Sequence, residues 1–523
     1  MLLLTAEEMR SLDRRTIGGG VATGIELMRR AGRGVVDCIE QRYGSLLGLR
    51  ALVLCGTGNN GGDGFVAAVR LRERGATVRV AVLGAIERIQ GDAALALADL
   101  RAAGIEVAPA STEAAISAIV HEVDEWDLGL DALLGTGARG APEGAIAAGV
   151  QALRELDEAG TRIIAVDLPT GVDADTGTLA RRAVRADLTV TFGHAKRGQY
   201  LYPGRTFCGV LEVVDIGLAW PPAGDSVGRV RLTSQEYAAG WLPLRGPTAH
   251  KGSTGRVLVI GGSAGLTGAV TLTARAASRA GAGYVQVAVP ASLLDVVSAK
   301  LTEQMPIACA ETPSRSLAPA AFDTIARYFD HVDAIALGPG LSRDPGSLEL
   351  ARRIIAEAPR PIVIDADALA AFTGTPVTPD SVPPRRVVTP HLGEMARLTG
   401  LDVDALQSGR IDAPCQWAAR WNAVVLLKGA PTVIGSADGH TQVNTTGNPG
   451  MATAGMGDVL TGVIATLLAQ GRGAFPAAWL GAWLHGAAGD HVAAERGAIG
   501  MVAGDVAEAL PAALRALERS RHS

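Results

Sequence analysis

Short apolar runs, each followed by a polar and often glycine-rich turn, recur along almost the whole chain. Such runs are typical of strands that are buried on both faces, as in a parallel sheet. The stretches 5–43, 65–74 and 475–519 instead place apolar side chains at helical spacing. The pattern therefore predicts an α/β fold with largely parallel sheets covered by helices. The predicted strands are residues 51–55, 78–83, 128–134, 163–166 and 187–191, and then 256–260, 284–289, 334–337, 361–364, 386–388 and 424–427.

The predicted strands form two groups along the chain. A stretch rich in proline and glycine, Ala219–Asp225, separates them. A length of 523 residues also suggests more than one hydrophobic core. We therefore expect two domains, residues 1–220 and 228–523, each a largely parallel sheet covered by helices. The first is expected to have a Rossmann-like, doubly wound sheet.

The first strand of the first domain ends in a glycine-rich loop, Gly56–Gly64, before a predicted helix. Strand, glycine-rich loop and helix is the order in which doubly wound sheets present backbone N–H groups to phosphate. The loop lacks the GxGxxG fingerprint, so it signals a nucleotide only weakly, and a plain flexible turn is the alternative. The adjacent Asn59 and Asn60 offer amide donors and acceptors that suit an alkali cation or a carboxamide.

Further polar residues stand at or near other strand ends of this domain. Asp131 belongs to the run 128–134, and Asp167 follows the run 163–166. One aspartate at such a place is often a turn cap, but several beside glycine loops favour a shared ligand site. No motif gives His194 or Lys196 a role, so we expect both at the surface or at the rim of a site.

Strand ends in the second domain carry glycine, aspartate, histidine and lysine. They are Gly338–Gly340, Asp365–Leu369, Thr389–Glu394 and Lys428–Thr432. Loops at the carboxyl ends of parallel strands meet along one edge of the sheet, so these segments are expected to line one crevice.

The stretch Asn444–Gly462 begins as a polar, glycine-rich loop and continues as an apolar helix. Gly455 and Gly457 then lie at a helix N-terminus, where free N–H groups favour an anion. Asp458 suits the removal of a proton from a hydroxyl that attacks a phosphoryl group, although it could be a simple first-turn acid. We expect Lys428 to reach a donor nucleotide and Mg²⁺ to bridge the phosphates of that nucleotide. Together with Asp458, these groups fit phosphoryl transfer to a small molecule.

Charge and composition exclude several classes of protein. A net charge of −5 argues against a broad nucleic-acid surface. The five cysteines include no CxxC, and the nine histidines include no HExxH, so neither a disulfide framework nor a zinc site is indicated. The sequence contains no apolar run of about 18 residues and no signal peptide. We expect a cytoplasmic protein without membrane spans, plausibly a homo-oligomer.

Together, these motifs resemble those of known enzyme families over nearly the whole chain. Lys428–Thr432, Asn444–Gly450 and Ala454–Gly462 resemble the ribokinase-like superfamily. More narrowly, Gly338–Gly340, Asp365–Leu369 and Thr389–Glu394 resemble the NAD(P)H-hydrate dehydratases. The N-terminal segments Ala6–Asp13, Gly24–Gly32 and Gly58–Gly64 resemble the NAD(P)HX epimerases. The order of the two parts is that of bacterial bifunctional nicotinamide-repair enzymes.

For the first domain, the resemblance implies interconversion of the R and S epimers of NADH or NADPH hydrated at C6 of the nicotinamide ring. Asp167 is the residue expected to transfer a proton at C6. The implied contacts to the hydrate (NAD(P)HX) are Asn59, Asn60, Gly61, Gly62, Asp63, Gly135, Thr136, Gly137, Ala138, Arg139, Gly140, Ala141 and Asp167. The implied ligands of a potassium ion are Asn60, Asp131 and Thr170.

For the second domain, the resemblance implies dehydration of the S epimer with Mg²⁺ and ADP or ATP. Asp458 would deprotonate the C6 hydroxyl, a phosphoryl group would be transferred to it, and phosphate would leave as the ring nitrogen supplies electrons. The implied hydrate contacts are Ala269, Gly340, His391 and Asp458, and the implied nucleotide contacts are Lys428, Gly429, Ala430, Pro431, Thr432 and Gly457.

Two residues depart from the pattern of these families. Thr170 stands where serine is usual, which keeps the hydroxyl. Met456 stands where threonine or serine is common, so a side-chain contact to phosphate is lost while the backbone N–H groups stay. Two alternatives remain open: a small-molecule kinase whose first domain only binds a ligand, and a first domain that is an interaction module.

Overall fold

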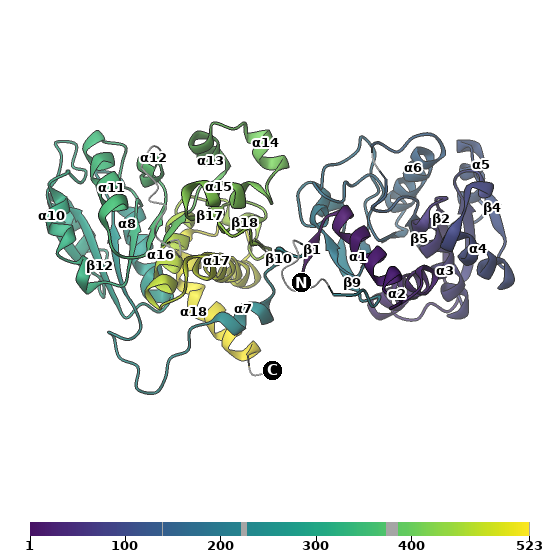
Figure 1. Ribbon diagram of the computed structural model, residues 1–523, viewed down its shortest axis with the longest axis horizontal. Coiled ribbons are helices and arrows are strands. Elements are labelled where there is room, and N and C mark those ends of the chain that lie inside the picture. Colours follow the sequence, from purple (N-terminus) through teal and green to yellow (C-terminus); the bar gives the residue numbers. More distant parts are fainter. Residues whose placement is uncertain (139, 221–226, 373–384, 522–523) are drawn as a thin grey trace. The chain divides into compact units, whose positions relative to one another are not determined.

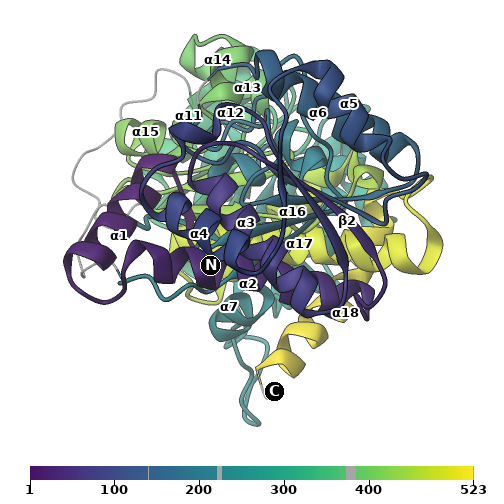
Figure 2. The same ribbon diagram turned by 90° about the vertical axis from the view of Figure 1, so that its right-hand side faces the viewer.

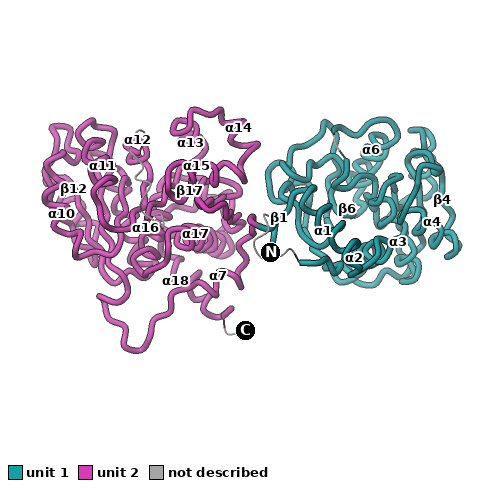
Figure 3. Tube along the Cα trace, viewed as in Figure 1, with its two compact units in different colours: residues 1–228 teal, residues 229–523 magenta. Residues whose placement is uncertain are grey.

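The computed structural model describes residues 1–138, 140–220, 227–372 and 385–521. The chain forms two compact units, residues 1–228 and 229–523, which Figure 3 shows in different colours. Most of the segment 219–225, at which a division of the chain was expected, lies outside the described residues. No helix in the described ranges is long and apolar enough to cross a membrane.

The sheet of the N-terminal unit has the strand order β4-β3-β2-β5-β6-β7-β9, and all of its neighbouring strands are parallel. The order reverses direction at β2, and a crevice forms at such a switch point beyond the carboxyl ends of the strands. A second, small sheet pairs β1 (Leu3–Leu4) with β8 (Ala195–Lys196) in parallel. The strands of the larger sheet are β2 (Arg50–Cys55), β3 (Thr77–Val82), β4 (Val107–Pro109), β5 (Leu128–Ala132), β6 (Arg162–Val166), β7 (Leu188–Phe192) and β9 (Val210–Val214).

Helices cover both faces of this sheet because each strand is apolar on both sides. Val53 and Cys55 of β2 pack with α2–α4, whereas Leu52 and Leu54 pack with α5 and α6 on the opposite face. Helices α2, α3 and α4 lie side by side (Figure 1, Figure 2). The helices of the unit are α1 (Ala6–Gly18), α2 (Gly24–Tyr43), α3 (Asn59–Glu73), α4 (Gly91–Ala102), α5 (Glu113–Val120) and α6 (Gly144–Glu158).

The sheet of the C-terminal unit has the order β10-β19-β18-β17-β16-β15-β14-β11-β12-β13. Its neighbouring strands are parallel except for the pairs β17–β18 and β18–β19. The strands are β10 (Val230–Leu232), β11 (Arg256–Ile260), β12 (Tyr284–Pro290), β13 (Met305–Cys309), β14 (Ala334–Leu337), β15 (Ile362–Ile364), β16 (Arg386–Val388), β17 (Val424–Leu427), β18 (Thr432–Gly435) and β19 (Thr441–Asn444).

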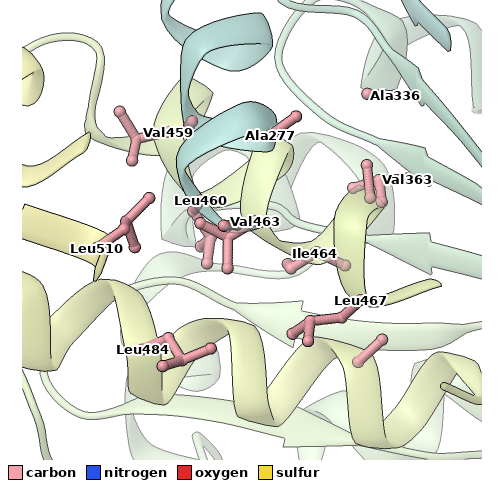
Figure 4. Close-up of a cluster of buried hydrophobic side chains, with 14 of the residues drawn as sticks. Ala277, Ala336, Val363, Val459, Leu460, Val463, Ile464, Leu467, Leu484 and Leu510 are labelled. Carbon is pink, nitrogen blue, oxygen red and sulfur yellow. The ribbon is translucent and has the colours of Figure 1, made fainter. Parts of the chain in front are cut away.

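Helix α16 (Met456–Ala469) is the central helix of this unit. Eleven of its fourteen residues are buried, which is expected of a helix enclosed on all sides rather than lying at the surface. Figure 4 shows its apolar side chains between α8, α17, α18 and the strands β14 and β15. The other helices are α7 (Gln235–Trp241), α8 (Thr267–Arg279), α9 (Leu294–Ser298), α10 (Ala321–Ala326), α11 (Pro345–Glu357), α12 (Ala368–Phe372), α13 (Leu392–Thr399), α14 (Val403–Ser408), α15 (Ala413–Trp421), α17 (Ala474–Arg496) and α18 (Ala503–Ser520).

The predicted strands are present, within one or two residues at each end, and the two largely parallel sheets confirm the predicted fold class. The prediction was wrong about the loop Gly56–Gly64. Its second half, from Asn59, is the beginning of α3. Glycines are used there because the helix packs closely: a side chain on Gly61 would collide with the backbone of Gly56, and one on Gly64 with Ala132.

Candidate functional sites

A cavity of about 740 Å³ lies at the carboxyl ends of β2, β5 and β6 in the N-terminal unit. It is lined by the start of α3, by α1 and α2, and by the segment that follows β5. Of the residues expected to contact the hydrate, the cavity is lined by Asn59, Asn60, Asp63, Gly135, Thr136, Gly137, Ala138 and Asp167. Gly140 and Ala141 line a neighbouring cavity of about 270 Å³, and Arg139 lies outside the described residues. Gly61 and Gly62 belong to the first turn of α3 and pack inside the fold instead, against Gly56 and Met28.

Asp131 and Thr170 form a buried pair beside this cavity. Thr170 donates to the Asp131 carboxylate from its backbone N–H and from its hydroxyl, both at 2.7 Å. The backbone N–H of Leu134 donates to the Thr170 hydroxyl at 3.1 Å. Burial raises the pKa of Asp131 to about 6, and the hydrogen bonds from Thr170 and Leu133 oppose that rise.

Asn60 is the unusual member of the expected cation site. Its side chain is buried, yet within the described ranges neither its Oδ1 nor its Nδ2 has a hydrogen-bond partner. Buried amides without partners are rare, so this one points to a ligand. An amide oxygen, a carboxylate and a hydroxyl are the oxygen donors that a hard cation such as K⁺ prefers. Asn60, Asp131 and Thr170 therefore fit a potassium ion by the chemistry of their side chains.

Asp167 stands directly after β6 in an unusual backbone conformation, with φ at +67°. Non-glycine residues adopt this conformation rarely, and mostly at functional sites, where it costs about 1–3 kcal/mol. The expectation for Lys196 was wrong. Lys196 is not a rim residue, because its side chain is only 2% exposed and its Nζ lies 2.5 Å from Asp167 Oδ1. His194 is half-buried against the ring of Trp220.

Two further carboxyl groups, Asp13 on α1 and Asp63 on α3, line the same cavity. Burial raises the pKa of Asp63 well above its usual value, and the charge of Asp167 raises it further. Burial also raises the pKa of Asp13, against the opposing charge of Lys196. The cavity thus combines carboxyls that tend to hold their protons with one carboxylate paired to a lysine, which is a setting for acid–base chemistry.

In the C-terminal unit, the N-terminus of α16 lies against a pair formed by a half-buried lysine and a buried aspartate. Gly455 precedes the helix with φ at +89°, a conformation suited to glycine. A Cβ on Gly457 would lie 3.3 Å from Lys428 Nζ and 3.5 Å from an oxygen of Asp365, so the helix N-terminus approaches both groups closely. Met456 points into the hydrophobic core and is 6% exposed, so its side chain is not available to a phosphate.

The pair consists of Lys428, which follows β17, and Asp365, which follows β15. Lys428 Nζ donates to Asp365 Oδ1 at 2.8 Å, and Thr461 of α16 donates to Asp365 Oδ2 at 2.8 Å. Lys428 also lies 3.7 Å from Glu394 Oε2. Asp365 is 1% exposed, so these contacts provide the counter-charge and hydrogen bonds that a buried carboxylate needs. The charge of Lys428 lowers the pKa of Asp365 against the effect of burial.

Asp458 lies in the first turn of α16, and no salt bridge to it is found among the residues that the structure describes. Burial raises its pKa to about 7, and the charges of Asp365 and Asp367 add to that rise while Lys428 opposes it. A carboxyl with a pKa near neutrality can accept a proton and give it up again, which suits a general base.

The other residues expected to contact the hydrate are linked to this centre. A Cβ on Gly340 would lie 3.3 Å from Cβ of Ala269, so these two residues are adjacent. The Thr273 hydroxyl lies within hydrogen-bond distance of the backbone oxygens of Ala269 and Asp458, at 3.1 and 3.0 Å. His391 begins α13, and it neighbours Lys428 through a parallel backbone bridge.

The segment Lys428–Thr432 is supported by a residue that sequence reasoning missed. Arg410 is 1% exposed, and its guanidinium donates to the carbonyls of Lys428 and Pro431 at 2.9 and 2.8 Å. A side chain on Gly429, where φ is +147°, would collide with Arg410. Burial lowers the pKa of Arg410 to about 10, which still leaves it charged at neutral pH. Nothing in the local sequence distinguishes Arg410 from an exposed helix-end arginine.

No group of three or more His, Cys, Asp or Glu side chains that could hold a metal ion occurs in the part of the chain that the structure describes. The N-terminal cavity and the α16 centre together define a two-site α/β enzyme, in which a doubly wound unit precedes a unit whose site suits phosphoryl transfer.

Comparison with known proteins narrows this class. The family model described as NAD(P)H-hydrate dehydratase matches residues 257–512, and that of the YjeF-related protein N-terminus matches residues 24–198. The bifunctional NAD(P)H-hydrate repair enzyme Nnr of Moorella thermoacetica is 44% identical over 521 residues, which cover 99% of this chain and 97% of that protein. The enzyme of the same name from Escherichia coli is 34% identical, over 96% of this chain and 92% of that protein.

Among solved structures, the ADP/ATP-dependent NAD(P)H-hydrate dehydratase from Bacillus subtilis, co-crystallized with ATP/Mg²⁺, is 29% identical. The match covers 55% of this chain and 99% of that one, with a TM-score of 0.49. The full-length similarity to the repair enzymes shows the family. The chain belongs to the bifunctional NAD(P)H-hydrate repair enzymes.

Proposed function

We propose that the two units repair hydrated nicotinamide nucleotides in sequence. The N-terminal unit interconverts the R and S epimers of NAD(P)HX, and the C-terminal unit dehydrates the S epimer with ADP or ATP. The products are NAD(P)H, phosphate, and AMP or ADP. The observation that carries this proposal is that a single chain contains both sites and is similar over 99% of its length to a bifunctional repair enzyme.

Epimerisation requires that the C6–O bond breaks and forms again on the opposite face of the ring. A proton is donated to the C6 hydroxyl, water leaves, and the electron pair of the ring nitrogen stabilises C6 as an iminium. Water then adds to the other face and loses a proton, so atoms and charge balance. In this proposal Asp167 transfers the proton at C6, because its carboxyl group lines the cavity and exchanges the proton with the C6 oxygen.

The remaining residues of the cavity orient the hydrate. Asn59, Asp63 and the segment Gly135–Ala138 line its walls, and their N–H, amide and carboxyl groups suit the carboxamide, ribose and phosphates of a nucleotide. Asn60, Asp131 and Thr170 would hold a potassium ion. When bound, that ion would supply positive charge beside the phosphates or hydroxyls of the hydrate.

Dehydration uses kinase chemistry for a lyase reaction. Asp458 accepts the proton of the C6 hydroxyl, the oxygen attacks the terminal phosphorus of ADP or ATP, and AMP or ADP leaves. The C6–O bond then breaks with release of phosphate as the ring nitrogen supplies electrons, and loss of a proton from C5 completes NAD(P)H. The N–H groups at the start of α16, including that of Gly457, stabilise the negative charge on the transferred group.

The segment Lys428–Thr432 is proposed to bind the nucleotide, and Ala269, Gly340 and His391 to contact the hydrate. Mg²⁺ would bind together with the nucleotide and would neutralise the charge of its phosphates. Buried Asp365 holds Lys428 beside the helix N-terminus, so the ammonium adds positive charge where phosphate is transferred.

The test is absorbance in the reduced-nicotinamide band after mixing the full chain with hydrated NADH, Mg²⁺ and either ADP or ATP. We expect recovery of both epimers, faster than they interconvert unaided, with one phosphate released per NADH. Recovery of the S epimer alone would refute the epimerase assignment. A stable phosphorylated product without free phosphate would instead indicate a small-molecule kinase.

We also propose that the enzyme acts in the cytoplasm as a homo-oligomer. Light scattering of the purified chain at working concentrations would measure the assembly, and a monomer mass would refute that part of the proposal.

A further inference from the structure

Lys196 is the buried charged group in the N-terminal unit for which neither the sequence motifs nor the family resemblance provides a role. Its ammonium contacts three oxygens: Asp167 Oδ1 at 2.5 Å, the Thr191 hydroxyl at 2.7 Å and the Phe192 carbonyl at 3.4 Å. Thr191 is fully buried and donates to the same Asp167 oxygen at 3.0 Å. Lysine and threonine therefore converge on one oxygen of one carboxylate.

The other carboxylate oxygen is left available. Within the described ranges, Oδ2 of Asp167 accepts no hydrogen bond, although the side chain is only 12% exposed and lines the 740 Å³ cavity. Oδ2 is not one of the buried side-chain oxygens that lack a hydrogen bond, so it is accessible from the cavity. The arrangement holds Oδ1 and presents Oδ2 to whatever occupies the cavity.

The same short segment also holds the main chain of Asp167. Gln199, in the turn that follows β8, donates to the Asp167 carbonyl at 2.7 Å and accepts from the backbone N–H of Lys196 at 2.7 Å. The Asp167 N–H donates to Val190 at 2.8 Å. These contacts maintain the left-handed backbone of Asp167, which would otherwise relax. Pairing of β8 with β1 anchors Lys196 itself.

We propose that Lys196, with Thr191, is a positioning residue for epimerisation: it fixes the Asp167 carboxyl group by one oxygen, so that the other oxygen exchanges a proton with the C6 oxygen of the hydrate. This inference rests on the proposed epimerase function.

The test uses the purified R epimer with full-length protein, Mg²⁺ and ADP. Because only the S epimer is dehydrated, the absorbance gain reports epimerisation once the unaided rate is subtracted. The S epimer alone measures the C-terminal unit of the same molecule and serves as an internal control. The variants are Lys196→Met, Lys196→Arg and Thr191→Val. Thr189→Val is the matched control, since Thr189 is also buried on β7 but donates to the carbonyl of Cys208.

We expect Lys196→Met to lower kcat for the R epimer about 100-fold, with KM within about threefold of the wild type. Lys196→Arg keeps the charge and should be at least about tenfold faster than Lys196→Met. Thr191→Val removes two hydrogen bonds, one to Asp167 and one from Lys196, and should lower kcat about tenfold. Thr189→Val, and the rate of every variant with the S epimer, should match the wild type.

A kcat for Lys196→Met within threefold of the wild type would overturn the proposal. So would a raised KM with unchanged kcat, because Lys196 would then bind the hydrate directly. If the N-terminal unit of Lys196→Met does not fold, the test rests on Thr191→Val. A wild-type kcat for Thr191→Val would then refute the proposal. A wild-type chain that does not convert the R epimer faster than the unaided reaction refutes the proposed epimerase function instead.

Discussion

The pKa of Asp458 makes dehydration depend on pH in a way that the structure specifies. Burial and the nearby charges of Asp365 and Asp367 raise that pKa to about 7. Asp458 accepts a proton only when it is charged, which applies to about one molecule in ten at pH 6 and about nine in ten at pH 8. We therefore expect kcat/KM for the S epimer to rise about tenfold between these pH values and to level off above them.

A substitution separates this cause from ionisation of the nucleotide. Asp365→Asn removes a neighbouring negative charge, which favours the charged form of Asp458, so the midpoint of the pH profile should move to lower pH. The nucleotide's own ionisation would not respond to this change. Asp295→Asn, which alters an exposed carboxylate on α9, is the control and should leave the midpoint unchanged. A flat profile from pH 6 to 8, or a midpoint that Asp365→Asn does not move, would refute the assignment of Asp458 as the base.

The same shift predicts a gain in stability when Asp458 is replaced. The pKa of this carboxyl is about 7 in the folded chain and 3.8 in the unfolded chain. Between pH 3.8 and pH 7 the folded chain therefore binds this proton more strongly than the unfolded chain does. Stability therefore falls as the pH rises through this range, by at most about 4 kcal/mol, and the loss is complete above pH 7. Asp458→Asn should be inactive yet raise the calorimetric Tm of the C-terminal unit at pH 8. The two proteins should converge below pH 4, and an Asp458→Asn protein that is less stable at pH 8 would contradict the analysis.

Three further predictions concern the other supports of the two sites. Arg410→Met removes the donors that hold the carbonyls of Lys428 and Pro431, so it should raise KM for ADP or ATP at least about tenfold. Arg410→Lys should have a KM between those of the wild type and Arg410→Met. An unchanged nucleotide KM in Arg410→Met would contradict this role. Asn60→Leu removes one expected cation ligand and should abolish the response of epimerisation to added K⁺, whereas dehydration of the S epimer should not change. Gly61→Ala should destabilise the N-terminal unit by about 1–3 kcal/mol in urea unfolding, since its side chain would collide with the backbone of Gly56.

Central strands could be predicted from the sequence because their apolar runs are fully buried. Val53 and Leu54, for example, face opposite layers of helices, so both positions must be apolar. Among the strands that the pattern missed, β4 and β13 lie at sheet edges and include half-buried and exposed positions, whereas β18 and β19 lie inside the sheet and are largely buried. The sequences of β4 and β13 carry little of the signal that burial imposes on a central strand.

The site residues also include some that the sequence predicts and some that it does not. Asp167 and Asp458 could be proposed from the sequence because each stands next to a strand end or a helix start, a position that local pattern reveals. Lys196 and Arg410 could not, because their roles depend on contacts with residues far along the chain. Lys196 contacts Asp167, 29 residues earlier, and Arg410 contacts Lys428, 18 residues later. Long basic side chains are usually exposed, so sequence reasoning assigns them to the surface by default.

Backbone strain marks both sites in the same manner, and it was not visible in the sequence. In the N-terminal unit Asp167, directly after β6, has φ at +67°, and in the C-terminal unit Ala366, two residues after β15, has φ at +50°. Glycine would adopt either conformation without cost, so its absence needs a reason. At the first position the carboxylate itself is required. At the second, Ala366 separates Asp365, which pairs with Lys428, from Asp367, which accepts from the backbone N–H of Ser342 at 2.9 Å. A left-handed residue between them turns the chain so that the two carboxylates have different partners.

Ala366→Gly should therefore relieve strain and stabilise the fold, while the looser backbone lowers kcat for dehydration. A variant with unchanged kcat would show that the backbone strain at Ala366 does not serve the site.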